Sequence, residues 1–239
     1  MQTIRGMSAT IGAILMLAAP VIAEDAAEQT PRLPKGMVYV PAGPFIMGSN
    51  VGDPDERPRH LDTTGAFYID KYEVGNAEFK RFDPTFSYGE GRDDHPAQVT
   101  WRQADAYAKW AGKRLPTEQE WEKAARGTDG RTFPWGESHD STFFSWDQDY
   151  PRGGAQACPE SPYGCVDMAG GAWEWTADWY QPYVGNDIQC EAYGQRYKVL
   201  RGGGSFNDVA MVRTTHRYYL PQDSMGNYYV GFRCVRDTE

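Results

Sequence analysis

The sequence predicts an irregular α+β fold in which long loops connect short helices and strands. Two segments, beginning at Thr100 and Thr117, carry helix-start signals followed by apolar residues at helical spacing. The strand-like runs are short, and 26 glycines and 16 prolines favour ordered loops over a regular stack of strands. Eight tryptophans and 15 tyrosines supply the large rings that can fill a core between such loops.

The two helices have defined starts and stops. The first follows Thr100, whose capping box ends at Gln103, and it stops at Gly112. The second follows Thr117 and stops at Gly127. The remaining elements expected are a helix over 77–82 and strands over 37–40, 45–47, 66–69, 198–201 and 231–235.

The first 23 residues have the pattern of a secretory signal peptide. Arg5 precedes a short apolar run, and small residues lead to a cleavage site after Ala23. The run is too short to span a bilayer, so an exported, periplasmic protein without a membrane anchor is expected. Residues 24–35 read as a flexible leader, and residues 36–239 as a single domain.

Charge and cysteine content narrow the possible partners. A net charge of -9 argues against nucleic-acid binding, and it suits an exported protein that meets calcium. Four cysteines in an oxidising compartment predict two disulfides. The favoured pairing is Cys158 with Cys165 and Cys190 with Cys234, although the spacing leaves the other pairings open. A zinc site is disfavoured because no C-x2-C pair is present.

A series of segments then resembles a known family. They are 37–48, 55–60, 72–76, 95–96, 114–127, 133–136, 170–179, 201–206 (RGGGSF) and 231–234 (GFRC). In this order they resemble the formylglycine-generating enzyme, or sulfatase-modifying factor, family over about residues 36–236. The resemblance implies an irregular, loop-rich α+β fold related to C-type lectin-like architectures.

The resemblance also implies a departure from the family's best-known chemistry. Its archetype oxidises a cysteine to formylglycine with dioxygen and a copper ion held by two cysteines, and those positions here are Asp208 and Arg213. Cu(I) prefers thiolates, and a protonated guanidinium cannot act as a ligand. Copper is therefore not expected. Ser205 matches the family serine beside the oxygen pocket, although a serine after three glycines is equally a turn residue.

Calcium is the metal that the resemblance favours. The matching positions are Asp167, the backbone carbonyls of Gly170 and Ala172, and Glu174. The alternative for Glu174 is an ion pair with a basic residue such as Arg233. Iron is left open: of the four histidines, His60 and His95 read as loop-fixing residues, and a site of two histidines and one carboxylate would need distant loops.

The main functional hypothesis is oxidative maturation of a periplasmic protein or small molecule, similar to the family's pyoverdine-maturation branch. Its candidate catalytic residues are Ser205, Asp208, Arg213 and His216. The alternative is a non-catalytic, lectin-like accessory protein that binds a partner through aromatic loops over 180–230, with Tyr180 and Tyr219 among the rings. Formylglycine generation is the least favoured activity.

Overall fold

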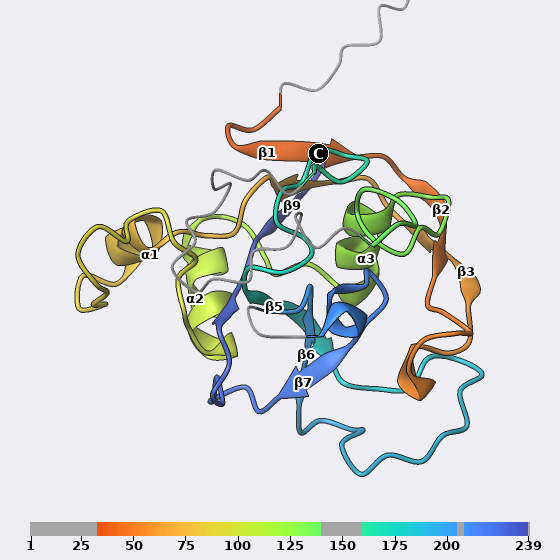
Figure 1. The fold of residues 1–239 in the computed structure, drawn as a ribbon. Helices are drawn as coiled ribbons and strands as arrows, with labels where there is room; N and C mark the ends of the chain where they lie inside the picture. The colour runs from red at the N-terminus through yellow and green to blue at the C-terminus, as the bar shows by residue number, and fades with distance from the viewer. Residues whose placement is uncertain (1–32, 140–158, 205–207, 239) are drawn as a thin grey trace, which may run out of the picture. The chain divides into compact units, whose positions relative to one another are not determined.

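The strands form three small sheets within the part of the chain that the structure describes (Figure 1). The structure is a computed structural model, and it describes residues 33–139, 159–204 and 208–238. One sheet has the order β1 (Met37–Val40), β4 (Phe67–Asp70), β9 (Val235–Asp237), and the second is the β2 (Gly43–Met47) and β3 (His60–Thr64) hairpin. The third has the order β7 (Tyr218–Leu220), β6 (Lys198–Arg201), β5 (Trp173–Trp179), β8 (Val230–Gly231).

The helices follow the predicted capping signals. The observed elements are α1 (Asn76–Phe82), α2 (Trp101–Trp110) and α3 (Glu118–Arg126), with short 3-10 turns η1 (Pro54–Glu56) and η3 (Val209–Val212). At α3, Thr117 Oγ1 accepts from the Glu120 backbone N–H at 3.2 Å, and the Glu120 carboxylate accepts from the Thr117 N–H at 2.8 Å. Gly127 ends this helix with φ 70°. These bonds confirm the capping prediction.

The strand predictions hold for β1 and β6, and to within two residues for β2 and β4. One expected strand over 231–235 is instead two, because the chain leaves β8 at Gly231 and joins a different sheet at Val235. The sequence prediction missed β3, β5 and β7. β5 pairs antiparallel with β6 and parallel with β8, which makes it the centre of the third sheet.

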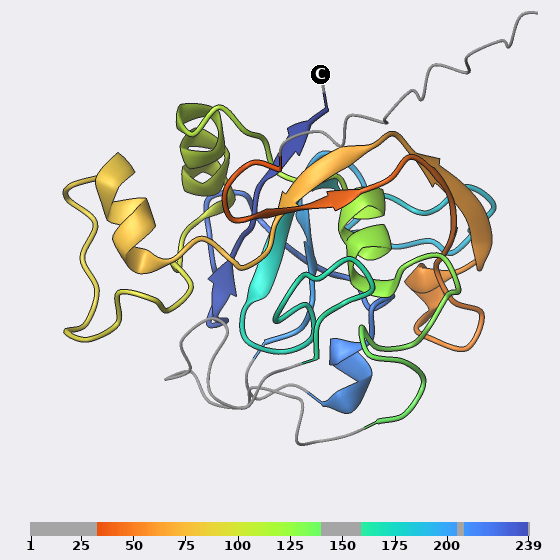
Figure 2. The same ribbon diagram turned by 90° about the horizontal axis from the view of Figure 1, so that it is seen from above.

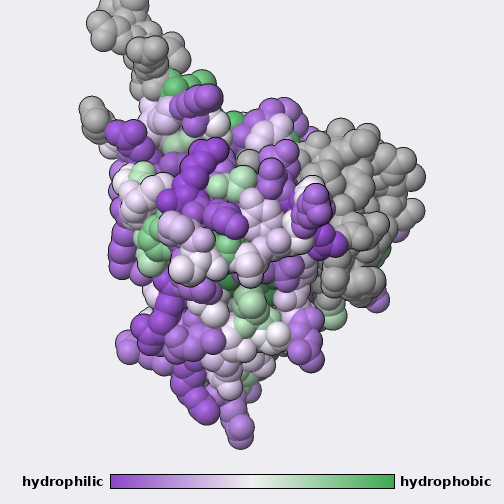
Figure 3. Space-filling view, turned by 90° about the vertical axis from the view of Figure 1, so that its left-hand side faces the viewer, coloured by the Kyte–Doolittle hydropathy of each residue, from purple (hydrophilic) through white to green (hydrophobic). Residues whose placement is uncertain are grey.

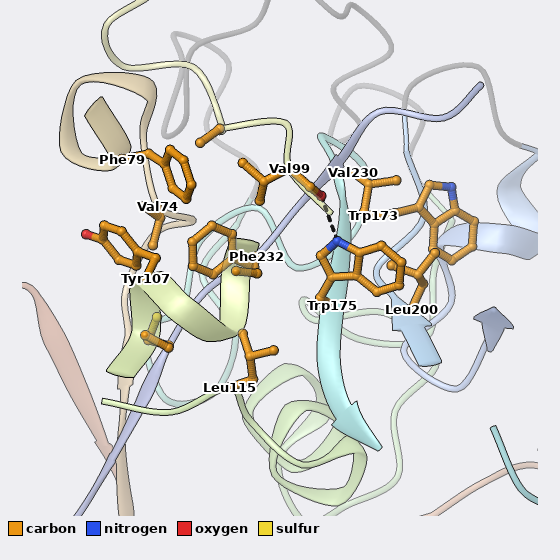
Figure 4. Packing of buried hydrophobic residues seen from close by; sticks show 14 of the residues in the cluster. Val74, Phe79, Val99, Tyr107, Leu115, Trp173, Trp175, Leu200, Val230 and Phe232 are labelled. Carbon is orange, nitrogen blue, oxygen red and sulfur yellow. Dashed lines mark hydrogen bonds between the residues drawn. The ribbon is translucent and has the colours of Figure 1, made fainter. Parts of the chain in front are cut away.

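The main core lies between β5, α1 and α2 (Figure 4). Trp173 and Trp175 on β5 are buried, and the Trp175 indole donates to the Val99 carbonyl at 2.9 Å. This bond satisfies the one polar atom of a large buried ring. α3 contacts β2, β3, β5 and β6, so its side chains lie between two sheets (Figure 2).

Buried charge on α3 is the unusual feature of this fold. Glu118, Glu122, Lys123 and Arg126 are all at most 5% exposed. Charged side chains are rarely buried unless they are paired. α3 therefore carries a set of ion pairs into the interior, where a strictly amphipathic helix would carry apolar residues.

The predicted disulfides are not formed. Cys165, Cys190 and Cys234 are free thiols, and Cys158 lies outside the described residues. Cys234 is buried in the main core, whereas Cys190 packs with a separate cluster of tyrosines, which explains why the expected pair does not meet. Burial raises the pKa of the Cys165 thiol to about 11, although Arg233 opposes the shift.

The face of the molecule that carries α1 is mainly hydrophilic, with apolar side chains scattered in small groups (Figure 3). Within the described ranges, no helix combines the length and apolar character needed to cross a membrane. The segment predicted to be a signal peptide lies outside those ranges.

Candidate functional site

Two of the four predicted catalytic residues meet at one site. Arg213 and His216 converge on η1, the 3-10 turn that follows β2. Asp208 does not join them: it caps η3, where its carboxylate accepts from the Ala210 N–H at 3.2 Å. Ser205 lies outside the described residues.

Glu56 is the centre of this site. Its side chain is fully buried, and its two oxygens accept from Arg213 Nη2 at 2.7 Å and from Thr215 Oγ1 at 2.6 Å. The Asp53 backbone N–H adds a third bond at 3.1 Å. Burial alone would raise the pKa of this carboxyl, but hydrogen bonds from His216 and Thr215 and the Arg213 charge lower it to about 2. Glu56 is therefore ionised at neutral pH.

His216 is held from one side of its ring. Nδ1 lies 3.0 Å from the Asp53 carboxylate and 3.6 Å from Glu56. These acceptors favour the tautomer with the proton on Nδ1, which makes Nε2 an acceptor. Asp53, Glu56, Arg213 and His216 are called the edge cluster here, because Asp53 is half exposed while the others are mostly buried.

The opposite side of the His216 ring has an unused hydrogen-bonding atom. Nε2 is buried, and none of the described residues bonds to it. The same is true of the indole N–H of Trp173, whose ring centroid lies 5.8 Å from that of His216. Buried polar atoms are usually paired with protein or water. His216 Nε2 and the Trp173 indole N–H are therefore a buried acceptor and a buried donor on neighbouring rings, neither bonded to any described residue.

The edge cluster also has the residue types of a metal site. Asp53, Glu56 and His216 offer ligand atoms within 4.8 Å of one another, and no other such group of three occurs in the described ranges. However, Arg213 Nη2 lies 2.7 Å from Glu56 and 3.3 Å from Asp53, so its charge already takes the place a cation would fill. His60 instead has Nδ1 2.7 Å from the Pro58 carbonyl, which fits its predicted loop-fixing role.

A second group of ion pairs lies deeper, around α3. This inner network consists of Glu118, Glu122, Arg126, Arg201 and Arg217, each at most 5% exposed. Arg201 bridges Glu118 and Glu122 at 2.7 Å each. Arg217 holds Glu118 with two bonds, and Arg126 holds Glu122 at 2.7 Å. All four carboxylate oxygens accept hydrogen bonds, so this network has no open acceptor for a ligand.

The predicted calcium ligands lie near β5. Glu174 is fully buried and accepts from Arg233 Nε and Nη2 at 2.7 Å each, and from the Trp121 indole at 2.9 Å. This is the ion pair that the sequence left as the alternative. Asp167 is buried in a left-handed conformation with φ 59°. Ala172 is fully buried, and the Gly170 N–H bonds to the Gly202 carbonyl at 2.9 Å.

Glu73 is a residue that the sequence prediction missed beside this group. Burial, with the charges of Glu174 and Asp167, raises the pKa of Glu73 well above its usual range, while Arg233 opposes the shift. Three carboxyl groups (Glu73, Asp167 and Glu174) therefore share one guanidinium, that of Arg233. Such a surplus of buried acid is the setting in which a bound cation would relieve repulsion.

Several predicted recognition rings prove to be part of the core. Tyr180 is 3% exposed and stacks on Tyr219 with ring centroids 4.4 Å apart. Tyr193 and Tyr197 pack into the same cluster. These rings contribute mainly to packing, which weakens the case for a broad aromatic binding surface.

Comparison with known proteins places these features in a family. The model of the sulfatase-modifying factor enzyme 1-like domain matches residues 23–238. The chain belongs to the sulfatase-modifying factor family. It is 30% identical to the formylglycine-generating enzyme of Bos taurus over 291 residues, covering 87% of this chain and 76% of that protein.

Other relatives have different names. The chain is 32% identical to the serine/threonine-protein kinase pkn1 of Chlamydia caviae, but it spans only 42% of that protein's length. Among solved structures, PvdO from Pseudomonas aeruginosa matches with a TM-score of 0.68 and 24% identity, covering 84% of this chain and 94% of the other. This likeness confirms the irregular α+β fold of the family.

The two residues that the resemblance aligned with the family's copper cysteines have other contacts in this structure. Asp208 caps a turn, and Arg213 pairs with Glu56. Sequence reasoning missed two residues of the site, Asp53 and Glu56. Asp53 lies two residues before the segment 55–60 that carried the resemblance, and Glu56 lies within that segment. An acidic pair at i and i+3 before a proline-rich turn was the available signal, but nothing local connects it with His216, which lies 163 residues away from Asp53.

Proposed function

We propose that this chain is an exported modifying protein that oxidises a substrate at the edge cluster without a copper ion held by cysteines. The observation that carries the proposal is His216, whose Nδ1 is fixed by Asp53 while Nε2 remains open beside the Trp173 indole. A histidine oriented by a carboxylate is the arrangement that general bases use. The carboxylate stabilises the imidazolium that forms when Nε2 takes a proton.

The proposed reaction removes two hydrogen atoms from the substrate. His216 accepts one proton at Nε2 while the substrate gives up two electrons and a second proton; dioxygen takes the two electrons and both protons, including the one that His216 releases, and leaves as hydrogen peroxide. Glu56 stays ionised throughout because its pKa is about 2. Its role is to keep Arg213 and Thr215 in place around the histidine.

The test compares cells that carry the intact gene, a deletion, or the His216→Gln variant. Mass spectrometry of exported small molecules and proteins is expected to find, in the deletion and in His216→Gln, a species two hydrogen atoms heavier than its normal counterpart. The control is Asp62→Asn, which neutralises a carboxylate on β3 outside the edge cluster. Cells with this variant should give the same products as cells with the intact gene. Unaltered products in the His216→Gln cells would remove His216 from the reaction.

A non-catalytic accessory role is the second candidate. One relative, 29% identical over 286 residues, is named inactive C-alpha-formylglycine-generating enzyme 2 of Mus musculus. An accessory protein would be needed for maturation, but it would tolerate His216→Gln. The same comparison of cells therefore separates the two roles, since only the deletion would then accumulate the unmodified species.

Calcium is proposed as a structural ion of this domain. Asp167 and the carbonyls of Gly170 and Ala172 would hold it, and the surplus of carboxyl groups around Glu73 favours a cation there. Glu174 fits less well, because both of its oxygens already bond to Arg233. Unfolding measured with calcium and with excess chelator tests the proposal: an unchanged midpoint would mean that Arg233 supplies all the positive charge.

A further inference from the structure

A cavity of about 260 Å³ is lined by Arg213 and Thr215, by residues of the β2–β3 connection and by residues between 130 and 137. Its lining is rich in hydrogen-bond donors. Arg59, Arg126 and Arg213 supply three guanidinium groups, whereas Glu137 is the one carboxylate among the lining residues. Three positive groups around a single cavity stand out in a chain of net charge -9.

The three arginines differ in how much of their charge is used. Arg126 pairs with the buried Glu122, and Arg213 pairs with Glu56. Arg59 is exposed, and within the described part of the chain no carboxylate forms an ion pair with it. One positive charge at the cavity is therefore left without a partner, which matches a ligand group with a single negative charge.

Other donors face the same cavity. Arg213 uses Nε for the Ala210 carbonyl and Nη2 for Glu56, so Nη1 is left without a bond to any described residue. Ser49 Oγ accepts from the Val51 and Gly52 N–H groups, which leaves its own proton free to be donated. Asn50 uses Oδ1 for the Arg59 N–H at 2.8 Å, which leaves its Nδ2.

We propose that this cavity binds a carboxylate group of the substrate, with Arg59 and Arg213 Nη1 as the charged donors and Ser49 and Asn50 as the neutral ones. A planar carboxylate has two oxygens for guanidinium donors, and its single charge balances Arg59. A dianion such as phosphate would add charge next to Glu137, which Thr132 Oγ1 holds at 2.7 Å. The cavity is of a size for one end of a molecule, so it anchors the substrate.

The anchor would act together with the edge cluster, because Arg213 belongs to both and Thr215, which lines the cavity, donates to Glu56 of the cluster. Its role as a substrate anchor rests on the proposed function, but anion binding itself does not. A carboxylate bound at Arg213 Nη1 would fix one end of the substrate near His216. The substrate class implied is thus a carboxylic acid, either a small molecule or a peptide.

Calorimetric titration of the full chain with N-acetylglycine at low chloride tests the inference, and N-acetylglycinamide serves as the uncharged control. N-acetylglycine is expected to bind saturably, and the amide at least about tenfold more weakly, because hydrogen bonds to charged groups are worth more than neutral ones. Arg59→Gln should weaken N-acetylglycine binding about tenfold. Arg57→Gln, an equally exposed neighbour that does not line the cavity, should leave it within about twofold.

Three results would overturn the inference. These are the absence of saturable N-acetylglycine binding, equal weakening by Arg57→Gln and Arg59→Gln, and tighter binding of inorganic phosphate than of N-acetylglycine. If binding behaves as expected while His216→Gln cells still make normal products, the carboxylate-binding site stands, and the proposed oxidation fails together with the anchor role that rests on it. The two proposals can therefore be judged separately.

Discussion

The inner network and the edge cluster both pair buried glutamates with arginines, but they differ in how completely their polar atoms are hydrogen-bonded. In the inner network, every carboxylate oxygen of Glu118 and Glu122 accepts from a buried arginine or a backbone N–H. In the edge cluster, Glu56 is equally saturated, but Asp53 is half exposed and His216 keeps an open Nε2. The inner network therefore has no carboxylate oxygen without a donor, whereas the edge cluster keeps one unbonded ring nitrogen, which the proposed function uses.

Among the variants that test this comparison, Glu122→Gln is expected to lose the most unfolding free energy. Glu122→Gln removes the shared partner of Arg126 and Arg201, and leaves buried positive charge without compensation. Breaking a buried ion pair in this way costs about 3–5 kcal/mol of unfolding free energy. Urea unfolding of the parent and the variant, monitored by tryptophan fluorescence, measures this loss of unfolding free energy.

The matched control is Glu120→Gln on the same helix, whose partner Arg114 is 37% exposed. The Glu120 side chain is 12% exposed, but Arg114 reaches solvent and keeps Asp237 as a partner, so this variant should lose clearly less stability than Glu122→Gln. Equal losses at Glu120 and Glu122 would show that burial does not distinguish the inner network.

Glu56 gives the next largest effect, and it depends on pH. The folded pKa of about 2 lies below the ordinary value of 4.5, so ionised Glu56 stabilises the fold at neutral pH by about 3 kcal/mol. For a lowered pKa, this contribution is present above the unfolded value and is lost as the pH falls toward about 2. The difference in unfolding free energy between the parent and Glu56→Gln should therefore shrink from about pH 4.5 downward. A difference independent of pH would contradict the assignment.

Asp178 lies at the border of the inner network, and its pKa is shifted in the opposite direction to that of Glu56. Burial and the nearby charge of Glu118 raise the pKa of Asp178 to about 6, against the backbone hydrogen bond from Glu118 and the charge of Lys198. Ionised Asp178 therefore costs stability above about pH 6, and this cost shrinks progressively as the pH falls from about 6 toward the ordinary value of 3.8. Asp178→Asn keeps an acceptor for the Glu118 N–H and should be more stable than the parent by about 1 kcal/mol at pH 7.

The measurement is the same unfolding series at pH 7 and pH 5. The gain from Asp178→Asn should be smaller at pH 5, where the parent is mostly protonated. A variant less stable than its parent at pH 7 would show that the Asp178 charge is compensated, with Lys198 as its partner.

Local signals in the sequence predicted the helices well and the site only in part. The capping boxes at Thr100 and Thr117 act within one turn, so they are readable without the fold. The spacing after Ser205 identified Arg213 as a departure from the copper site. Its partner Glu56 lies 157 residues away and could not be inferred, because ion pairs between loops depend on how the chain folds back.

The same limit explains the failed disulfides. Spacing suggested that Cys190 could reach Cys234, but Cys234 lies in the main core directly before β9, and Cys190 joins the tyrosine cluster. β5 was missed although its residues, Trp173 to Trp179, do alternate between apolar and polar. The polar residues Glu174 and Thr176 are as buried as the tryptophans, so the strand packs on both faces, which alternation alone does not predict.

The smallest expected effect separates stability from function within the edge cluster. Asp53→Asn changes a half-exposed carboxylate, so it should cost less than about 1 kcal/mol of unfolding free energy. It nevertheless removes the charge that orients His216 through Nδ1, and cells carrying it should accumulate the unmodified substrate as His216→Gln cells do. A variant that unfolds early would make Asp53 part of the structural interior, and one with normal products would leave Glu56 as the group that orients His216. Only a stable protein with impaired maturation fits an edge cluster whose incomplete pairing serves chemistry.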